Sequence, residues 1–236
     1  LRPKVPVMVE ASSKRSKVYH TGAIRQRVEG ALSEELGVTI QPEAPICIRV
    51  RLDDDYCTIS IDTSGDPLHK RGHKLAVNKA PMRETMAAQF LLACGYKAGD
   101  PVVDPMCGSG TFVIEAAEMA LGLQAGRSRN FAFEQLPSFE KAAYDDLRTP
   151  EPDLSDAQVQ YWGSDRDAGA IKMSQENAER AGVTPVTAFM KASISELQRP
   201  DTDRPGFVMV NPPYGDRIGD KHGLTGLYAA FGKVIA

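Results

Sequence analysis

The pattern of apolar and polar residues changes near residue 80 and divides the chain into two parts. In the first part, we expect a short strand at 5–9, a helix at 21–36 and a hairpin at roughly 46–62. The helix has apolar residues at helical spacing from Ile24 to Leu36, and Gly37 is a typical stop. The order strand, helix, strand, strand predicts a partial α+β unit.

The hairpin has a register in which its apolar residues share one face. That register places Leu52 opposite Cys57, with 53–56 as the loop, and we expect the shared face to be buried. The residues on it are Ile48, Val50, Leu52, Cys57, Ile59 and Ile61. Cys47 then points away from Cys57, so the two cannot form a disulfide. Because the four cysteines also lack metal-ligand spacing, we expect reduced thiols.

From residue 80 onward, strands and helices alternate. The pattern predicts strands at 102–104, 159–162, 186–190 and 207–210, with helices at 81–95, 108–121, 139–148, 167–181 and 224–235. This alternation is typical of an α/β doubly wound parallel sheet, in which ligands bind beyond the carboxyl ends of the strands. Three polar segments fall at such ends: residues 104–111, 164–167 and 211–214.

Charge and composition narrow the class of protein. The net charge is −3, yet the first 27 residues hold seven basic side chains and one acid, which favours an anion-binding module. No apolar run approaches the ~18 residues of a membrane span, and no apolar signal core begins the chain. We therefore expect a cytoplasmic protein. The first residue is not Met and the last residues continue a helical pattern, so we interpret the chain as a fragment.

The segment from Asp104 to Thr111 indicates a cofactor loop. Its glycines allow a sharp turn and close approach of a ligand, and the following helix presents free N–H groups to an anion. Asp104 can meet an ammonium group. No Walker lysine follows, and a purely structural glycine turn remains the alternative.

The segment around Asp165 predicts a ribose site. An acid at the end of the second strand can hold both ribose hydroxyls, although the gap from the loop is wider than the usual ~20 residues. The interrupted segment 122–157 accounts for this gap. Asp167 is placed to cap the following helix.

The segment Asn211-Pro212-Pro213-Tyr214 indicates a site for a planar amine. The Asn side-chain carbonyl and a proline carbonyl can accept two hydrogen bonds from an –NH2 group. The Tyr ring can stack on a base. The alternative is a stiff Pro-Pro turn without a ligand.

In that order, DPMCGSGT, GSD and NPPYG resemble class I S-adenosylmethionine-dependent methyltransferases that act on amino nitrogens. KVYHTGAIRQRVEGAL, PLHKRGHK and APMRETMAAQFLLACGY further resemble the THUMP-containing guanine-N2 RNA methyltransferases, in particular the bacterial 23S rRNA enzymes. The similarity runs from about Val7 to Phe231. It implies a partial THUMP-like RNA-binding domain at 1–65, a basic linker loop at 66–79 and a Rossmann-like methyltransferase domain at 80–236. It also implies that C-terminal strands are missing, because the family's sheet has seven.

The resemblance implies a cofactor, a reaction and site residues. The cofactor is S-adenosylmethionine, and its methyl group passes to guanine N2 in RNA, with 23S rRNA favoured over tRNA. The residues implied to bind the cofactor are Asp104, Pro105, Cys107, Gly108, Ser109, Gly110, Thr111 and Asp165. The residues implied to bind the target guanine are Asn211, Pro212, Pro213 and Tyr214. Residues 82–85 are assigned to the methionine end of the cofactor. The family's Asp after the third strand is absent here, so Ser193 or backbone groups take its place.

Basic residues are the expected RNA contacts, since phosphates are bound mainly by Lys and Arg. They are Lys14, Arg15, Lys17, His20, Arg25, Arg27, His69, Lys70, Arg71, His73 and Lys74. His69 and His73 have no third metal ligand nearby, so no metal site is predicted. Cys107 is interpreted as a small loop residue and not a nucleophile.

Two other functions stay open at this point. An NPPY methyltransferase could act on adenine N6 or protein glutamine, and would need no RNA-binding front. A non-catalytic RNA-binding module would be consistent with the absent adenine-contact Asp. No oligomeric state follows from the sequence.

Overall fold

The computed structural model describes residues 1, 5–76, 81–148, 152–213 and 221–235. Contacts divide the chain into two compact units, which we call unit 1 (residues 1–68 and 129–148) and unit 2 (69–128 and 149–236). This division differs from the sequence-based one in two places. Residues 69–76, expected in a linker, belong to unit 2, whereas residues 129–148, expected in the methyltransferase domain, belong to unit 1.

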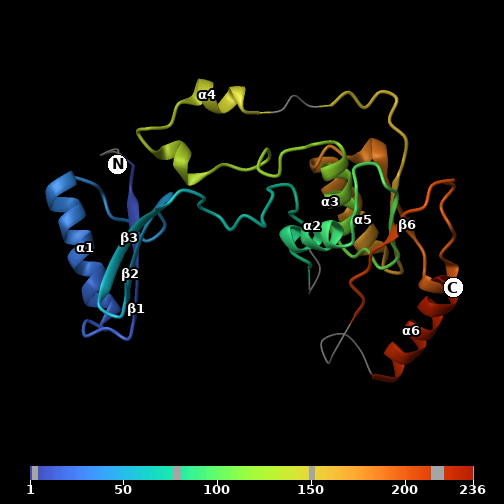
Figure 1. Ribbon diagram of the computed structural model, residues 1–236, viewed down its shortest axis with the longest axis horizontal. Helices are drawn as coiled ribbons and strands as arrows, with labels where there is room; N and C mark the ends of the chain where they lie inside the picture. Colours follow the sequence, from blue (N-terminus) through green and yellow to red (C-terminus); the bar gives the residue numbers. More distant parts are fainter. Residues whose placement is uncertain (2–4, 77–80, 149–151, 214–220, 236) are drawn as a thin grey trace. The chain divides into compact units, whose positions relative to one another are not determined.

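Unit 1 is built on a three-stranded sheet with a helix packed against it (Figure 1). Its elements are β1 (Val7–Lys14), α1 (Thr21–Leu36), β2 (Ile46–Asp53), β3 (Tyr56–Asp62), η1 (Ala132–Gln135) and α4 (Lys141–Asp146). The strand order is β1-β2-β3, with β1 parallel and β3 antiparallel to β2. β1 extends past the predicted residue 9, because its backbone pairs with β2 as far as Lys14 opposite Asp53.

The predicted hairpin register is confirmed, since Leu52 lies opposite Cys57. All four cysteines are free thiols, as expected. The expected burial of the apolar face is only half correct. Ile48 and Val50 are buried in the core beside α1, but Ile59 and Ile61 on β3 are 60% and 44% exposed. The reason is that α1 packs against β1, whereas β3 is the far edge strand.

Residues 129–148 fold onto unit 1 through backbone and aromatic contacts. The Phe133 N–H donates to the Thr63 carbonyl at 3.0 Å, and Leu136 packs against the core of the sheet. Phe133 also contacts the rings of Phe139 and Tyr144. The apolar residues of this segment therefore complete unit 1.

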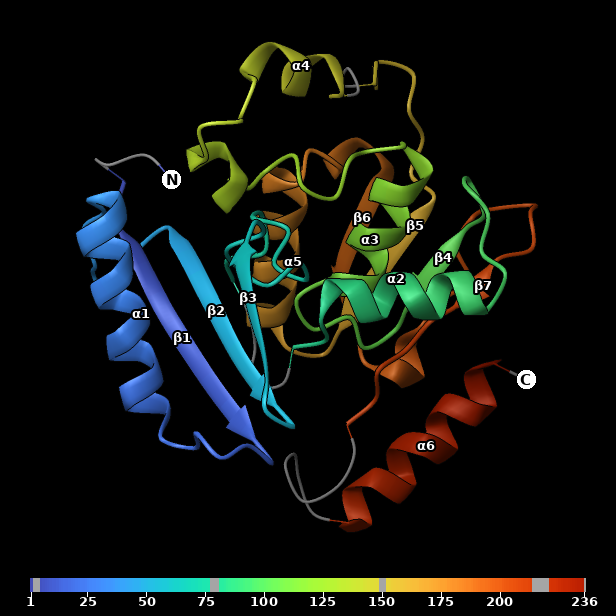
Figure 2. The ribbon, with the colours of Figure 1, turned by 60° about the vertical axis from the view of Figure 1, so that its left-hand side comes forward.

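Unit 2 is an α/β unit whose four-stranded sheet has the order β6-β5-β4-β7, all parallel (Figure 2). Its elements are α2 (Glu84–Ala93), β4 (Val102–Asp104), α3 (Thr111–Ala120), β5 (Tyr161–Asp165), α5 (Ala168–Arg180), η2 (Thr184–Val186), β6 (Thr187–Lys191), η3 (Ile194–Glu196), β7 (Phe207–Val208) and α6 (Lys221–Ile235). The order doubles back at β4, which confirms the predicted doubly wound fold.

Helices α3 and α5 pack on the strands and on each other, and α2 packs on α3. α3 is buried along most of its length, because small residues such as Ala116 and Ala117 allow close packing. Asp167 caps α5 by accepting a hydrogen bond from the Gly169 N–H at 2.8 Å, as predicted. No helix among the described residues is long and apolar enough to cross a membrane.

α2 begins at Glu84 and not at Pro81, where the sequence pattern places it. The Met82 carbonyl does not join the helical hydrogen bonds. It accepts instead from the Lys74 ammonium at 2.6 Å, and the first turn closes on the Arg83 carbonyl. α2 thus begins later than predicted, where the Met82 carbonyl is bound by Lys74.

Candidate cofactor and substrate site

The three polar segments singled out in the sequence follow three neighbouring parallel strands. Asp104 ends β4, Asp165 ends β5 beside it, and Asn211 follows β7 on the other side of β4. The Met209 N–H donates to the Val103 carbonyl at 2.9 Å, so β4–β7 pairing continues almost to Asn211. Because parallel strands end at the same edge, the three segments share the switch point of the sheet, where ligands of this fold bind.

The glycine loop has the backbone freedom that the sequence predicts. Gly108 and Gly110 have φ angles of +55° and +83°, which other residues rarely adopt. Nothing lies within 4 Å of the position that a Cβ on Gly108 would take, so space is open beside the loop. A Cβ on Gly163 of β5 would instead lie 2.6 Å from the Phe189 ring. Gly108 thus faces room for a ligand, whereas Gly163 allows close packing.

Asp165 joins the loop to the second strand. One of its carboxylate oxygens accepts from the Gly108 N–H at 3.0 Å, and the other accepts from the Asp167 N–H at 2.9 Å. Each oxygen retains a lone pair for a further donor such as a hydroxyl. The carboxylate is thereby held at the strand end in the place expected for ribose recognition.

Asp104 is a buried acid, only 3% exposed, with a hydrogen bond from the Met106 N–H at 3.0 Å. Burial raises the pKa of this carboxyl to about 7, and the nearby Asp165 charge adds to the rise. A cationic group bound beside it would favour the ionised form. The site therefore suits an ammonium ligand.

Cys107 is buried, and its Sγ lies 3.7 Å from the Ser174 hydroxyl on α5. Burial raises the pKa of the thiol well above its usual value, so the thiolate form is disfavoured. The structure supports the interpretation of Cys107 as a packed loop residue.

Two residues of α5 that the sequence reasoning missed hold the glycine loop. The Ser174 hydroxyl lies 2.8 Å from the Gly108 carbonyl, and the Asn177 amide donates to the Ser109 carbonyl at 3.1 Å. Both side chains are fully buried. Two uncharged polar residues on the apolar face of a helix, three positions apart, are the signal that could have revealed them.

The Asn211–Pro213 segment lies at the surface of the sheet edge and is partly buried. The Tyr228 hydroxyl of α6 donates to the Pro213 carbonyl at 3.0 Å, so this carbonyl is already engaged. Asn211 and the Pro212 carbonyl thus remain the predicted amine acceptors. Tyr214 lies outside the described residues.

Ser193 precedes η3, and both its N–H and its hydroxyl bind the Glu196 carboxylate, at 2.9 Å and 2.7 Å. The Ala192 N–H donates to the Asp165 carbonyl at 3.1 Å, which ties this turn to the end of β5. The adenine contact assigned to Ser193 stays a prediction. The observed role of its side chain is to cap a turn.

Residues 69–76, which we call the strap, include five predicted RNA contacts, and three of these are turned inward. Arg71 pairs with the buried Glu115 at 2.7 Å, and His73, 3% exposed, faces Glu118 at 3.4 Å. Lys74 donates to Thr111 Oγ1 at 2.7 Å. These three side chains thus make contacts inside unit 2, and their assignment to RNA stays a prediction. Lys70 is exposed and His69 is partly exposed.

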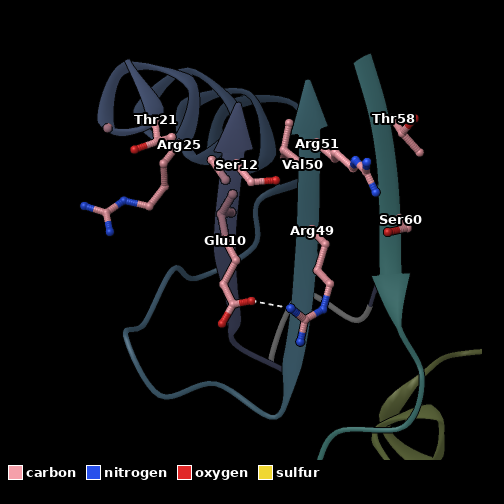
Figure 3. Close-up of a pocket in the computed structure, with 12 residues that line it drawn as sticks. Glu10, Ser12, Thr21, Arg25, Arg49, Val50, Arg51, Thr58 and Ser60 are labelled. Atoms are coloured by element: carbon pink, nitrogen blue, oxygen red, sulfur yellow. Dashed lines mark hydrogen bonds and ion pairs between the residues drawn. The ribbon is translucent and has the colours of Figure 1, made fainter. Parts of the chain in front are cut away.

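The basic residues of unit 1 are placed as predicted at its surface. Lys14, Arg15, Lys17, His20, Arg25 and Arg27 are all exposed. A separate pocket of about 620 Å³ lies on the sheet of unit 1. Figure 3 shows its lining residues, among which Arg49 pairs with Glu10. Arg49 also pairs with Asp62, and Arg51 pairs with Asp53. Carboxylates thus balance the arginines of this pocket, as they do Arg15 and Arg25 in the segment from Lys14 to Arg27.

Comparison with known families identifies unit 2. Residues 71–236 match the model of UPF0020, described as an RMKL-like methyltransferase domain. The chain belongs to this methyltransferase family. The match begins inside the strap, which agrees with the packing of the strap on unit 2. The family supports S-adenosylmethionine as the cofactor, as predicted from the sequence.

Individual relatives agree with this assignment. A ribosomal RNA large subunit methyltransferase K/L from Vibrio campbellii is 35% identical over 94% of this chain, which spans 34% of that protein. The chain thus covers about a third of the length of the curated relatives it matches. A predicted N6-adenine-specific DNA methylase from Listeria monocytogenes has 31% identity and a TM-score of 0.84, covering 99% of this chain and 63% of that one.

A third relative was solved with a product of the expected cofactor. The methyltransferase SMU.472, in complex with SAH, has 27% identity and a TM-score of 0.79 over 100% of this chain and 64% of that one. The described residues contain no group of three or more His, Cys, Asp or Glu side chains that could hold a metal ion.

Proposed function

We propose that this chain is the cofactor-binding and RNA-binding part of a cytoplasmic methyltransferase that modifies guanine N2 in RNA, with 23S rRNA as the substrate. The observation that carries the proposal is the meeting of Asp104, Asp165 and Asn211 at one switch point in a methyltransferase-family fold. The ribosomal RNA methyltransferase named among the relatives supports an rRNA substrate.

The residues at the sheet edge fit S-adenosylmethionine. Asp165 accepts hydrogen bonds from the ribose hydroxyls, and the open space beside Gly108 admits the ligand next to the loop. Asp104 faces the methionine ammonium, and this positive charge favours the carboxylate form of Asp104 that burial disfavours. When bound, the cofactor supplies a methyl group carried on a sulfonium. The sulfonium is a good leaving group that becomes a neutral thioether, so no covalent enzyme intermediate is needed.

Asn211 and Pro212 orient the target amine. The Asn211 side-chain carbonyl and the Pro212 carbonyl accept its two N–H groups, so that the nitrogen lone pair points at the methyl group. These oxygens also stabilise the positive charge that develops on the nitrogen. Tyr228 holds the end of this turn through the Pro213 carbonyl. A base must be unpaired or flipped out of its stack to enter.

Unit 1 captures the RNA in this proposal. Its exposed residues from Lys14 to Arg27 bind phosphates and position the substrate without reading its sequence. We infer that unit 1 is the partial THUMP-like domain indicated by the sequence.

The test of the reaction is tritium transfer from labelled S-adenosylmethionine to unmodified rRNA. Asn211→Ala should lower the transfer rate by about 100-fold or more, since it removes an oriented acceptor at the reacting amine. Affinity for S-adenosylhomocysteine should not change. The matched control is Asn130→Ala, an exposed residue of unit 1. Unchanged transfer in Asn211→Ala would exclude this mechanism.

One observation favours adenine N6 as a second candidate target. The Listeria structure carries the name of an N6-adenine-specific DNA methylase. Digestion of the methylated product to nucleosides separates the two. N2-methylguanosine supports the proposal, whereas N6-methyladenosine replaces it with the second candidate.

A further inference from the structure

Lys74 lies where the strap contacts the start of α3, the helix that follows the glycine loop. Its ammonium donates to the Thr111 hydroxyl at 2.7 Å and to the Met82 carbonyl at 2.6 Å. Thr111 is the first residue of α3 and directly follows Gly110. A single cation thus holds the end of the glycine loop and the segment before α2, which the sequence assigns to the methionine end of the cofactor.

Buried charges keep Lys74 in this place. Burial lowers the pKa of its ammonium, whereas the nearby Glu84 and Glu115 carboxylates, 6% and 4% exposed, oppose this effect. Glu115 is shared with Arg71. The two carboxylates therefore favour the charged form of Lys74, while its hydrogen bonds go to the Thr111 hydroxyl and the Met82 carbonyl.

The strap itself is fixed from the other side by α5. Asn177 donates to the Ala76 carbonyl at 2.8 Å and also to the Ser109 carbonyl of the glycine loop. Arg180 donates to the His73 carbonyl at 2.8 Å. The strap and the loop are therefore tied together on both sides of Lys74.

The cofactor's amino-acid end has two charges, and the site residues predicted from the sequence include a partner for only one of them. Asp104 suits the ammonium, but the carboxylate needs a cation or free N–H groups. The N-terminus of α3 has no side-chain cap, and its first turn contains no acid. Lys74 is the cation that binds the hydroxyl of the first residue of this helix.

We propose that Lys74 prepares the subsite for the carboxylate of the cofactor, by fixing Thr111 and by placing a positive charge at the start of α3. This inference rests on the proposed function. Lys74 is a positioning residue in this role, and it does not contact RNA.

The test compares two ligands by calorimetry on the 236-residue chain. S-adenosylhomocysteine has the amino-acid end, whereas 5′-methylthioadenosine keeps the adenosine and lacks that end. Lys74→Met should weaken binding of S-adenosylhomocysteine by about 10- to 100-fold, because Thr111 and the positive charge are no longer held in place for the ligand carboxylate. Affinity for 5′-methylthioadenosine should stay within about twofold, because the adenosine contacts are unaffected.

Matched variants make the comparison specific. Lys172→Met, on an exposed lysine of α5, should leave both affinities unchanged. Thr111→Val removes only the acceptor hydroxyl, and it should lower S-adenosylhomocysteine affinity selectively even if Lys74→Met proves too unstable to purify. Combined with Lys74→Met, it should add little further loss, because the two residues act together.

Three outcomes would overturn the inference. Equal weakening of both ligands by Lys74→Met would mean that Lys74 supports the whole pocket. Unchanged affinity for both ligands, together with weaker RNA binding, would show that Lys74 contacts RNA phosphates. Failure of the wild-type chain to bind either ligand would remove the proposed function, and this inference with it.

Discussion

The strap and the segment from Lys14 to Arg27 are both basic in sequence, yet their charges have different surroundings. The basic side chains of the first segment are exposed, and three of them pair with partly exposed acids, for example Arg25 with Glu29. In the strap, Arg71 and His73 lie against Glu115 and Glu118 of α3. The difference teaches that a run of positive charge has to be interpreted together with the acids that the fold places beside it.

The largest contrast concerns stability. Glu115→Ala should lower the free energy of unfolding by about 3–5 kcal/mol, because it leaves Arg71 buried without its partner. Urea denaturation followed by fluorescence of Trp162, the single tryptophan, reports on unit 2 directly. The matched control is Glu176→Ala, which breaks an exposed pair on α5. Similar small losses in both variants would contradict the contrast.

Asp104 provides a pH test of a buried charge. Its pKa is raised to about 7, so its contribution to the stability of the unliganded chain is complete below about pH 4 and is lost as the pH rises through 7. At pH 8, the free energy of unfolding of Asp104→Asn should therefore be about 2–4 kcal/mol higher than that of the wild type. It should also bind S-adenosylhomocysteine more weakly.

The readout is the difference between wild type and Asp104→Asn across pH, measured by denaturation. This difference removes the contributions of Glu118, whose pKa is raised to about 7 by burial, and of His73, whose pKa is lowered to about 4 by burial. The exposed Asp156→Asn is the control. A difference that does not vary between pH 4 and 8 would rule out the buried charge.

RNA affinity separates the two basic segments. Replacing Lys14, Arg15 and Lys17 by Ala should weaken RNA binding by about tenfold and reduce its dependence on salt, because fewer counterions are released. Cofactor affinity should be unaffected. Filter binding at several salt concentrations measures the RNA affinity and its dependence on salt, with Lys74→Met as the comparison. A lower salt slope in Lys74→Met would indicate that the strap does contact phosphates.

The smallest effect is expected for a surface ion pair of unit 1. Arg25→Ala breaks the pair with Glu29 on α1, whose nitrogen and oxygen are 3.6 Å apart. Water screens this pair, so the free energy of unfolding should change by less than ~0.5 kcal/mol. Circular dichroism during denaturation at low and high salt measures the change. A loss above ~1 kcal/mol would show that exposure does not separate the two classes of charge.

The sequence pattern predicted the main elements because their apolar residues follow the helix and strand periods. Helix 21–36, strand 102–104 and the hairpin register agree with the structure. The start of α2 and the exposure of β3 were predicted wrongly. Both involve contacts that periodicity does not show, namely Lys74 with Met82 and α1 with β1.

The candidate site shows the same division. The sequence located the three strand-end segments, because glycines, acids and prolines at those positions have few other uses. It missed Ser174 and Asn177, and it did not predict the hydrogen bond from Lys74 to Thr111. A signal for the strap was present in α3, where Glu115 and Glu118 are buried acids among mostly apolar residues and require cations.

By itself, the sequence determined that unit 2 is a doubly wound sheet, and it predicted a cofactor loop, a ribose acid and an amine site in chain order. Local periodicity and backbone chemistry are sufficient for that, since they act over a few residues. Only the tertiary structure decided which charges face water, because burial depends on segments far apart in the chain. It moved the strap into unit 2, moved residues 129–148 into unit 1, and placed Lys74 at the start of α3.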